Sequence, residues 1–262
     1  MTTGVIDGIA WRADGSGPPV VLIHSGVTDH RMWDGVVGEL VGSYTLIRYD
    51  LRGFGASPAP SGPFRHGDDL RSVLDHLDLA ECAIVGNSLG GKLALDFCGA
   101  APDRVTSLAL LAPPIAGRDW SPSFREYGAA ERSAIEAGDL DAAIRLNLDM
   151  WVRGPAREWS APLRALADEV TDPMRTSLAN QAATEALELD DEHPPVEDHL
   201  ADLKTPTLVG IGDVDVPDFV SVAEYLAVTI PGAELVRFPG AGHLLPLERP
   251  GEVSAILRRF LG

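Results

Sequence analysis

Apolar residues in this chain gather into short runs that are separated by longer amphipathic segments. The runs consist mainly of Val, Ile, Leu and Ala, and their length suits strands that are buried on both faces. We predict such strands at residues 20–24, 45–50, 82–88, 107–112, 207–212 and 234–238. A further strand at residues 5–12, followed by the turn-forming segment DGSGPP, is expected to return into Val20 as an antiparallel edge.

Between these strands, apolar residues recur at helical spacing. Helices are predicted at residues 33–41, 67–77, 90–101, 219–229 and 250–261. Repeated alternation of buried strands and helices is typical of a parallel sheet that is covered on both faces. The sequence therefore predicts the α/β class, with a mostly parallel sheet and helices on both sides.

The alternation is interrupted between residues 117 and 200. This stretch has little strand character, and the segment ERSAIEAGDLDAAIRLNLDMW at 131–151 shows helical spacing throughout. Insertions are tolerated at the carboxyl ends of parallel strands, where such sheets also bind ligands. We therefore predict a core formed by residues 1–116 and 201–262 and a helical cap, residues 117–200, that covers the site.

The segment GNSLG at residues 86–90 has the pattern G-x-S-x-G, directly after a predicted strand and before a predicted helix. In that context the chain turns so sharply that the central residue, here Ser88, takes a strained conformation and exposes its hydroxyl. The helix N-terminus behind it favours developing negative charge. Ser88 is therefore the candidate nucleophile.

A serine hydroxyl needs a base, and the base needs a group that orients it. His243 lies in the loop FPGAGHLLP, which follows the last predicted strand and precedes the last helix. Asp213 and Asp215 both follow the strand at 207–212. We choose Asp215 as the triad acid and keep Asp213 as the alternative; the order Ser, Asp, His is that of α/β-hydrolases.

Backbone N–H groups must hold the negative charge of a tetrahedral intermediate. The expected donors are Leu89, which follows the nucleophile, and Gly26, in the loop after the strand at 20–24. Several apolar and loop residues are candidates to line the substrate pocket: Ser25, Trp120, Phe124, Met150, Trp151, Trp159 and Leu244. Each aromatic residue among them would also suit the interior of the cap.

These motifs together resemble the α/β-hydrolase fold family, along nearly the full chain outside the predicted cap. The resemblance rests on LIHSG at 22–26, RYDLRGFGAS at 48–57, VGNSLGG at 85–91, GDVDVP at 212–217 and FPGAGHLLPLERP at 238–250. It implies an eight-stranded sheet, a helical cap between the sixth and seventh strands, and a triad that uses no metal and no organic cofactor. The family commonly has His-Gly where this chain has His24-Ser25.

Composition narrows the expected partners. The formal net charge of -18 leaves no basic surface for nucleic acid or anionic membranes, so we expect neither as a partner. The sequence shows no signal peptide and no apolar stretch long enough to span a membrane, which favours a location in the cytoplasm. Cys82 and Cys98 are expected to be buried free thiols. The histidines show no metal-ligand spacing. A monomer or homodimer with a small-molecule acyl substrate is expected.

The expected reaction is hydrolysis of a carboxylic ester or lactone through an acyl-enzyme. Three alternatives remain open at this point. The serine elbow is also similar to that of meta-cleavage C–C bond hydrolases, and the same scaffold serves non-hydrolytic biosynthetic tailoring enzymes and ligand receptors. A serine at position 88 argues against haloalkane dehalogenases and epoxide hydrolases, which use aspartate there.

Overall fold

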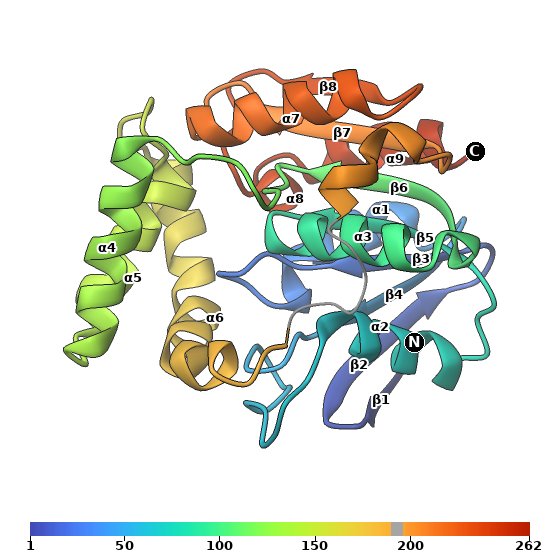
Figure 1. The fold of residues 1–262 in the computed structure, drawn as a ribbon, viewed down its shortest axis with the longest axis horizontal. Coiled ribbons are helices and arrows are strands. Elements are labelled where there is room, and N and C mark those ends of the chain that lie inside the picture. Colours follow the sequence, from blue (N-terminus) through green and yellow to red (C-terminus); the bar gives the residue numbers. More distant parts are fainter. Residues whose placement is uncertain (190–195) are drawn as a thin grey trace.

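A single sheet organises the chain, of which the structure describes residues 1–189 and 196–262. In this computed structural model the described residues form an eight-stranded sheet with the order β1-β2-β4-β3-β5-β6-β7-β8 (Figure 1). Its strands are β1 (Thr2–Ile6), β2 (Ile9–Gly15), β3 (Pro19–Ile23), β4 (Thr45–Tyr49), β5 (Cys82–Asn87), β6 (Val105–Leu111), β7 (Thr207–Gly212) and β8 (Glu234–Phe238). Strands β3 to β8 pair in parallel, which confirms the predicted mostly parallel sheet.

The antiparallel edge differs from the sequence prediction. Strands β1 and β2 form a hairpin around Asp7 and Gly8, which have φ angles of 51° and 85°. An Asp-Gly pair suits a two-residue turn of this kind because both positions need positive φ. Strand β2 then pairs with β4 rather than with the strand that begins near Val20. The expectation of one strand at residues 5–12 returning into Val20 was therefore wrong.

Helices cover both faces of the sheet. Successive residues of a strand point to opposite sides, so a continuous apolar run presents apolar side chains on both faces. On β3, Val20 and Leu22 belong to one hydrophobic cluster and Val21 and Ile23 to the other. The first cluster is covered by α1 (Asp34–Leu40), α8 (Leu245–Glu248) and α9 (Pro250–Leu261). The second is covered by α2 (His66–His76), α3 (Leu89–Ala100) and α7 (Pro217–Thr229).

Three more helices stand beside one end of the sheet (Figure 1). They are α4 (Pro122–Glu136), α5 (Leu140–Asn147) and α6 (Ala161–Glu185), and a π-helical segment, Leu148–Arg153, follows α5. We call α4 to α6 the helical insertion, since it lies between β6 and β7. It packs against the second hydrophobic cluster, which α3 also covers, through buried residues such as Val152 and Met174. Part of the predicted cap, residues 190–195, lies outside the described residues.

Short 3-10 helices complete the described structure, at His30–Trp33, Pro102–Arg104 and Val196–Asp202. Cys82 and Cys98 are buried free thiols, as the sequence predicts. The Cys98 thiol lies 3.3 Å from the Thr205 hydroxyl, and burial raises the pKa of Cys82 to about 12. Among the described helices, none combines the length and the apolar character needed to cross a membrane.

Candidate active site

Ser88 lies at the turn between β5 and α3. Its φ and ψ angles are 54° and -120°, a region that L-residues rarely adopt and that stores strain. The flanking glycines make this turn feasible. A Cβ atom on Gly86 would lie 2.0 Å from the carbonyl oxygen of Gly90, and one on Gly90 would lie 2.3 Å from the carbonyl oxygen of Ile23. The G-x-S-x-G spacing thus follows from the close approach of β5, α3 and β3.

Ser88, His243 and Asp215 are brought together at the carboxyl end of the sheet. The Oγ atom of Ser88 lies 2.8 Å from Nε2 of His243. Nδ1 of His243 lies 2.9 Å from Oδ2 and 3.1 Å from Oδ1 of Asp215. Because a carboxylate accepts hydrogen bonds, Nδ1 carries the ring proton and Nε2 is left to accept the serine proton. This is the arrangement required of a nucleophile, its base and an orienting acid.

The alternative acid, Asp213, has a different partner. Its Oδ1 atom accepts a hydrogen bond of 2.6 Å from the backbone N–H of Gly240, in the loop that leads to His243. Asp215 is 4% exposed, and its Oδ1 atom also accepts from the N–H of Val216 at 2.6 Å. Asp213 therefore braces the histidine loop, while Asp215 contacts the imidazole itself.

The loop after β3 lies next to the serine. Gly26 and Leu89 both line the cavity at Ser88, and a Cβ atom on Gly26 would lie 3.5 Å from Cδ2 of Leu89. The buried His24 fixes this loop, since its Nδ1 donates to the carbonyl of Ser25 at 2.8 Å and its Nε2 accepts from the N–H of Leu51 at 3.0 Å. Burial lowers the pKa of His24, consistent with a neutral structural ring.

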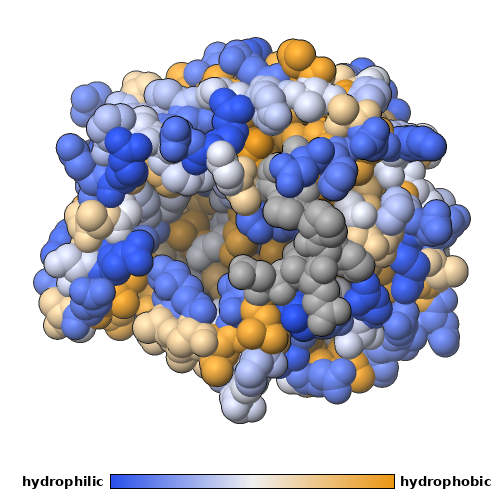
Figure 2. Space-filling view, viewed as in Figure 1, coloured by the Kyte–Doolittle hydropathy of each residue, from blue (hydrophilic) through white to orange (hydrophobic). Residues whose placement is uncertain are grey.

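A cavity of about 380 Å³ opens above Ser88, between the sheet and the helical insertion. Figure 2 shows this face of the molecule hollowed, with hydrophobic surface in the depth of the hollow. Its apolar lining comes from Val27, Phe54, Leu89, Phe124, Trp151 and Leu178. Its polar lining, besides Ser88 and His243, includes His66, Glu131, Asn147, Gln181, Glu185 and Glu188. Phe124 and Trp151, two of the candidate pocket residues, are among the side chains that line this cavity.

Five other predicted pocket residues do not line this cavity. Leu244 is fully buried in the core, and the Ser25 hydroxyl bonds to that of Thr28 at 3.0 Å. Trp120 packs on other aromatic rings, and Nε1 of Trp159 donates to Asp149 at 3.1 Å. Met150 packs against the hydrophobic cluster. Local packing and hydrogen bonds within the fold occupy these side chains, which places them outside the lining of this cavity.

A polar network on the helical insertion was not foreseen from the sequence. The Tyr127 hydroxyl lies 3.0 Å from Oε1 of Glu131, and Nδ2 of Asn147 donates to the same oxygen at 2.5 Å. Nε1 of Trp151 donates to the Tyr127 hydroxyl at 2.9 Å. The i, i+4 spacing of Tyr127 and Glu131, and of Asn147 and Trp151, is the signal that points to this network.

Aromatic rings enclose the imidazole of His243. The ring centroid of Trp151 lies 4.4 Å and that of Phe219 lies 4.7 Å from the imidazole centroid, and His243 is only 2% exposed. Asn87, which directly precedes Ser88, donates a hydrogen bond from Nδ2 to the backbone carbonyl of His243 at 3.3 Å. Both contacts restrict the ring to the position that faces Ser88.

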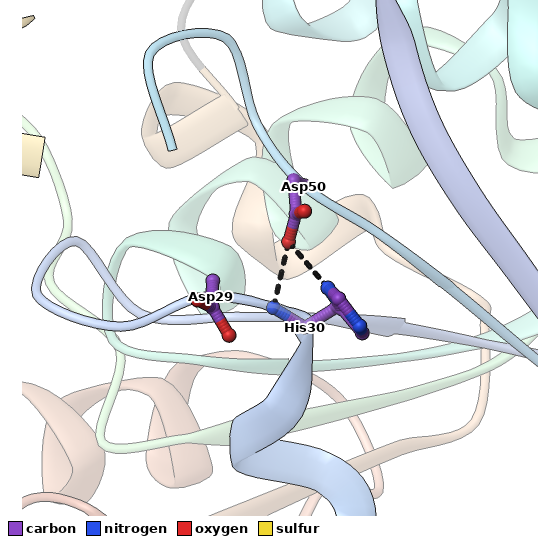
Figure 3. A group of neighbouring side chains, drawn as sticks. All are labelled: Asp29, His30 and Asp50. Carbon is purple, nitrogen blue, oxygen red and sulfur yellow. Dashed lines mark hydrogen bonds and ion pairs between the residues drawn. The ribbon is translucent and has the colours of Figure 1, made fainter. Parts of the chain in front are cut away.

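Asp29, His30 and Asp50 each offer one potential metal-ligand atom, and these three atoms lie within 4.8 Å of one another (Figure 3). Their atoms are already engaged, however. Oδ1 of Asp50 accepts from both the backbone N–H and Nδ1 of His30 at 2.8 Å, while Asp29 pairs with Arg31 at 2.6 Å. Nε2 of His30 faces the Arg12 guanidinium at 3.3 Å. The group thus ties the loop after β3 to the loop after β4.

Known proteins match this chain over nearly its whole length. A pimeloyl-[acyl-carrier protein] methyl ester esterase of Nitrosomonas europaea is 27% identical over 233 residues, covering 87% of this chain and 90% of that protein. A solved thermophilic esterase from Thermogutta terrifontis is 28% identical, with a TM-score of 0.79 and coverage of 97% and 92%. A solved N-acyl homoserine lactone degrading enzyme is also 28% identical, with a TM-score of 0.79 and coverage of 99% and 100%.

The family model described as the Alpha/beta hydrolase family matches residues 20–256. This range runs from β3 into α9 and includes the serine turn, both candidate acids and the histidine loop. Since the model spans most of the chain and the sheet has the corresponding architecture, the protein is a member of the alpha/beta hydrolase family.

Proposed function

We propose that this protein is a serine hydrolase that cleaves a carboxylic ester or lactone through an acyl-enzyme. The observation that carries the proposal is the 2.8 Å contact between Ser88 Oγ and His243 Nε2, with Asp215 on the opposite ring nitrogen. The esterase and lactone-degrading relatives support the same class of substrate.

In the first half of the reaction, the Ser88 oxygen attacks the carbonyl carbon while Nε2 of His243 takes the hydroxyl proton. Asp215 keeps the ring in the reactive tautomer and stabilises the imidazolium that forms. The tetrahedral intermediate then collapses. The bond to the leaving alcohol oxygen breaks, and His243 returns the proton to that oxygen.

In the second half, the acyl group on Ser88 reacts with water. His243 removes a proton from the water, whose oxygen attacks the acyl carbon, and the proton is then returned to the serine oxygen. The carboxylic acid leaves and the free hydroxyl is restored. For a lactone, the alcohol and the acid remain parts of one released molecule.

Negative charge develops on the carbonyl oxygen in both halves. The backbone N–H groups of Gly26 and Leu89 are the donors we assign to it, since both residues line the cavity next to Ser88. Leu89 is also the first residue of α3, and the N-terminus of a helix favours negative charge. Loss of one such donor costs about a hundred- to a thousandfold in rate.

Turnover of a substrate panel tests this function. Wild type and Ser88→Ala are compared on p-nitrophenyl acetate, p-nitrophenyl butyrate, a γ-lactone and a dienoate that absorbs visible light. We expect ester or lactone turnover that Ser88→Ala abolishes. Wild-type activity in the variant would contradict the assignment of Ser88, and turnover of the dienoate alone would favour C–C hydrolysis.

A further inference from the structure

The described lining of the active-site cavity carries carboxylates but no Lys or Arg. Glu131, Glu185 and Glu188 all face it. The additional histidine in the lining, His66, adds no positive charge at neutral pH, because burial lowers its pKa to about 3. The formal charge of the lining is therefore negative, in a chain whose net charge is already -18. Such a cavity disfavours substrates that carry a carboxylate.

Glu131 is a carboxylate of this lining that two neighbouring side chains hold in place. It is partly buried, and its Oε1 atom accepts from Tyr127 and Asn147 at 3.0 and 2.5 Å. Burial and the adjacent Glu131 raise the pKa of Tyr127, so its hydroxyl stays protonated and able to donate. No hydrogen bond within the described residues engages Oε2 of Glu131. This carboxylate of the cavity lining therefore keeps one oxygen that no described protein group engages.

Aromatic rings of the cavity lie beside this carboxylate. The centroid of Phe124 lies 5.8 Å from that of Tyr127 and 6.0 Å from that of Trp151, and Tyr127 and Trp151 are 5.6 Å apart. Aromatic faces attract cations through the ring quadrupole, and several faces together recognise quaternary ammonium groups. The aromatic set and Glu131 therefore supply two independent attractions for a positive charge.

These rings also connect the carboxylate to the reacting serine. Trp151 contacts both the imidazole of His243 and the ring of Tyr127. Glu131 and Ser88 line the same cavity. A single small molecule can therefore place an ester carbonyl at Ser88 and a charged end near Glu131.

We infer that the substrate of this hydrolase carries a positively charged ammonium group, which Glu131 and the rings of Phe124, Tyr127 and Trp151 hold. The inference rests on the proposed function, because it assigns the substrate of the same cavity. It commits Glu131 to substrate selection rather than to the chemical steps at Ser88.

A pair of esters with the same shape tests the inference. p-Nitrophenyl 4-(trimethylammonio)butanoate carries a quaternary nitrogen where p-nitrophenyl 5,5-dimethylhexanoate has a carbon atom. We expect wild type to favour the cationic ester by about tenfold in kcat/KM, since desolvated cation–π contacts and a carboxylate act together. The variant Glu131→Gln keeps the shape of the side chain and its acceptor for Tyr127, and we expect it to lose this preference.

Glu136→Gln is the matched control. Glu136 lies on the same helix, α4, is exposed and does not line the cavity, so its removal changes the net charge equally. We expect this variant to keep the wild-type preference. Equal kcat/KM for the two esters in wild type, or a preference that survives in Glu131→Gln, would overturn the inference.

Binding to Ser88→Ala separates this inference from the proposed function. Titration calorimetry compares 4-(trimethylammonio)butanamide with 5,5-dimethylhexanamide, which are not substrates for this variant. Tighter binding of the cationic amide, lost in Ser88→Ala/Glu131→Gln, supports the cation site even if wild type hydrolyses no ester. Ester hydrolysis without any preference for the cation in binding or turnover overturns the inference while the proposed function stands.

Discussion

The indole ring of Trp151 lies 4.4 Å from the imidazole of His243, centroid to centroid, with an angle of 36° between the ring planes. Trp151 belongs to the π-helical segment Leu148–Arg153 of the helical insertion, whereas His243 belongs to the loop after β8. The insertion therefore contacts the candidate base directly. π-Helical turns are frequent at functional sites, where they redirect single side chains.

Replacing this indole should impair turnover. Trp151→Leu removes the surface against which His243 packs, and a displacement of the imidazole lowers kcat/KM on p-nitrophenyl butyrate by roughly ten- to a hundredfold. Trp159→Leu is the control, because Trp159 bonds to Asp149 and lies outside the cavity. Circular dichroism verifies that both variants are folded. Equal activity of the two folded variants would show that Trp151 does not position the histidine.

The two acids after β7 should differ sharply when each is made neutral. Asp215→Asn leaves the imidazole without a partner that selects its tautomer, and we expect kcat to fall by about 10⁴-fold. Asp213→Asn weakens only the contact to the Gly240 N–H, which costs about 0.5–1.5 kcal/mol in unfolding free energy. Steady-state kinetics and urea denaturation measure the two effects. A larger loss of kcat in Asp213→Asn would reverse the assignment.

The glycines of the serine turn should tolerate no side chain. Gly90→Ala places a methyl group against the carbonyl of Ile23, where a Cβ atom would lie 2.3 Å away, so we expect little folded protein. Gly38→Ala in α1 has nothing within 4 Å of its Cβ position. We expect that control to gain about 0.5–1 kcal/mol in unfolding free energy from helix propensity. Thermal unfolding compares them, and a normal transition in Gly90→Ala would contradict the geometry.

Burial of His66 predicts a pH dependence of stability. Its pKa is about 3 in the folded protein and about 6.5 when exposed, so the unfolded chain binds the proton first as the pH falls. The free energy of unfolding contributed by neutral His66 is thus present above about pH 6.5 and is lost toward pH 3. In His66→Gln this loss is absent, which removes a slope of up to about 1.4 kcal/mol per pH unit.

Urea denaturation between about pH 7 and pH 4 measures this difference in slope. His199→Gln is the control, because it removes a histidine whose side chain is exposed to solvent. Parallel stability curves for wild type and His66→Gln would mean that His66 is not held neutral in the folded protein.

The sheet was predictable because its buried parallel strands are continuous apolar runs. The ranges 207–212 and 234–238 coincide with β7 and β8. The strand, turn and helix around Ser88 follow from the glycines that lie two positions before and two positions after this serine. The position of β2 was not predictable in the same way. Its pairing with β4 depends on contacts between segments that are distant in sequence, although the Asp-Gly pair at residues 7 and 8 does indicate the hairpin.

The lining of the cavity was predicted only in part. Phe124 and Trp120 both sit near the start of the helical insertion, yet Phe124 lines the cavity while Trp120 packs on Phe219. Helical spacing indicates which residues are buried but not what they contact, since that depends on how the helix is placed on the core. The polar residues Glu131 and Asn147 were missed because they meet only when α4 and α5 pack together.

Covalent labelling by a fluorophosphonate probes the activated serine most directly, because the reagent requires a nucleophilic hydroxyl and no natural substrate. Intact-mass and peptide analysis should find one adduct on wild type, at Ser88, and none on Ser88→Ala or His243→Ala. Labelling of Ser88 in the absence of the imidazole at the wild-type rate, or an inert Ser88 in the folded wild-type protein, would contradict a triad built from Ser88, His243 and Asp215.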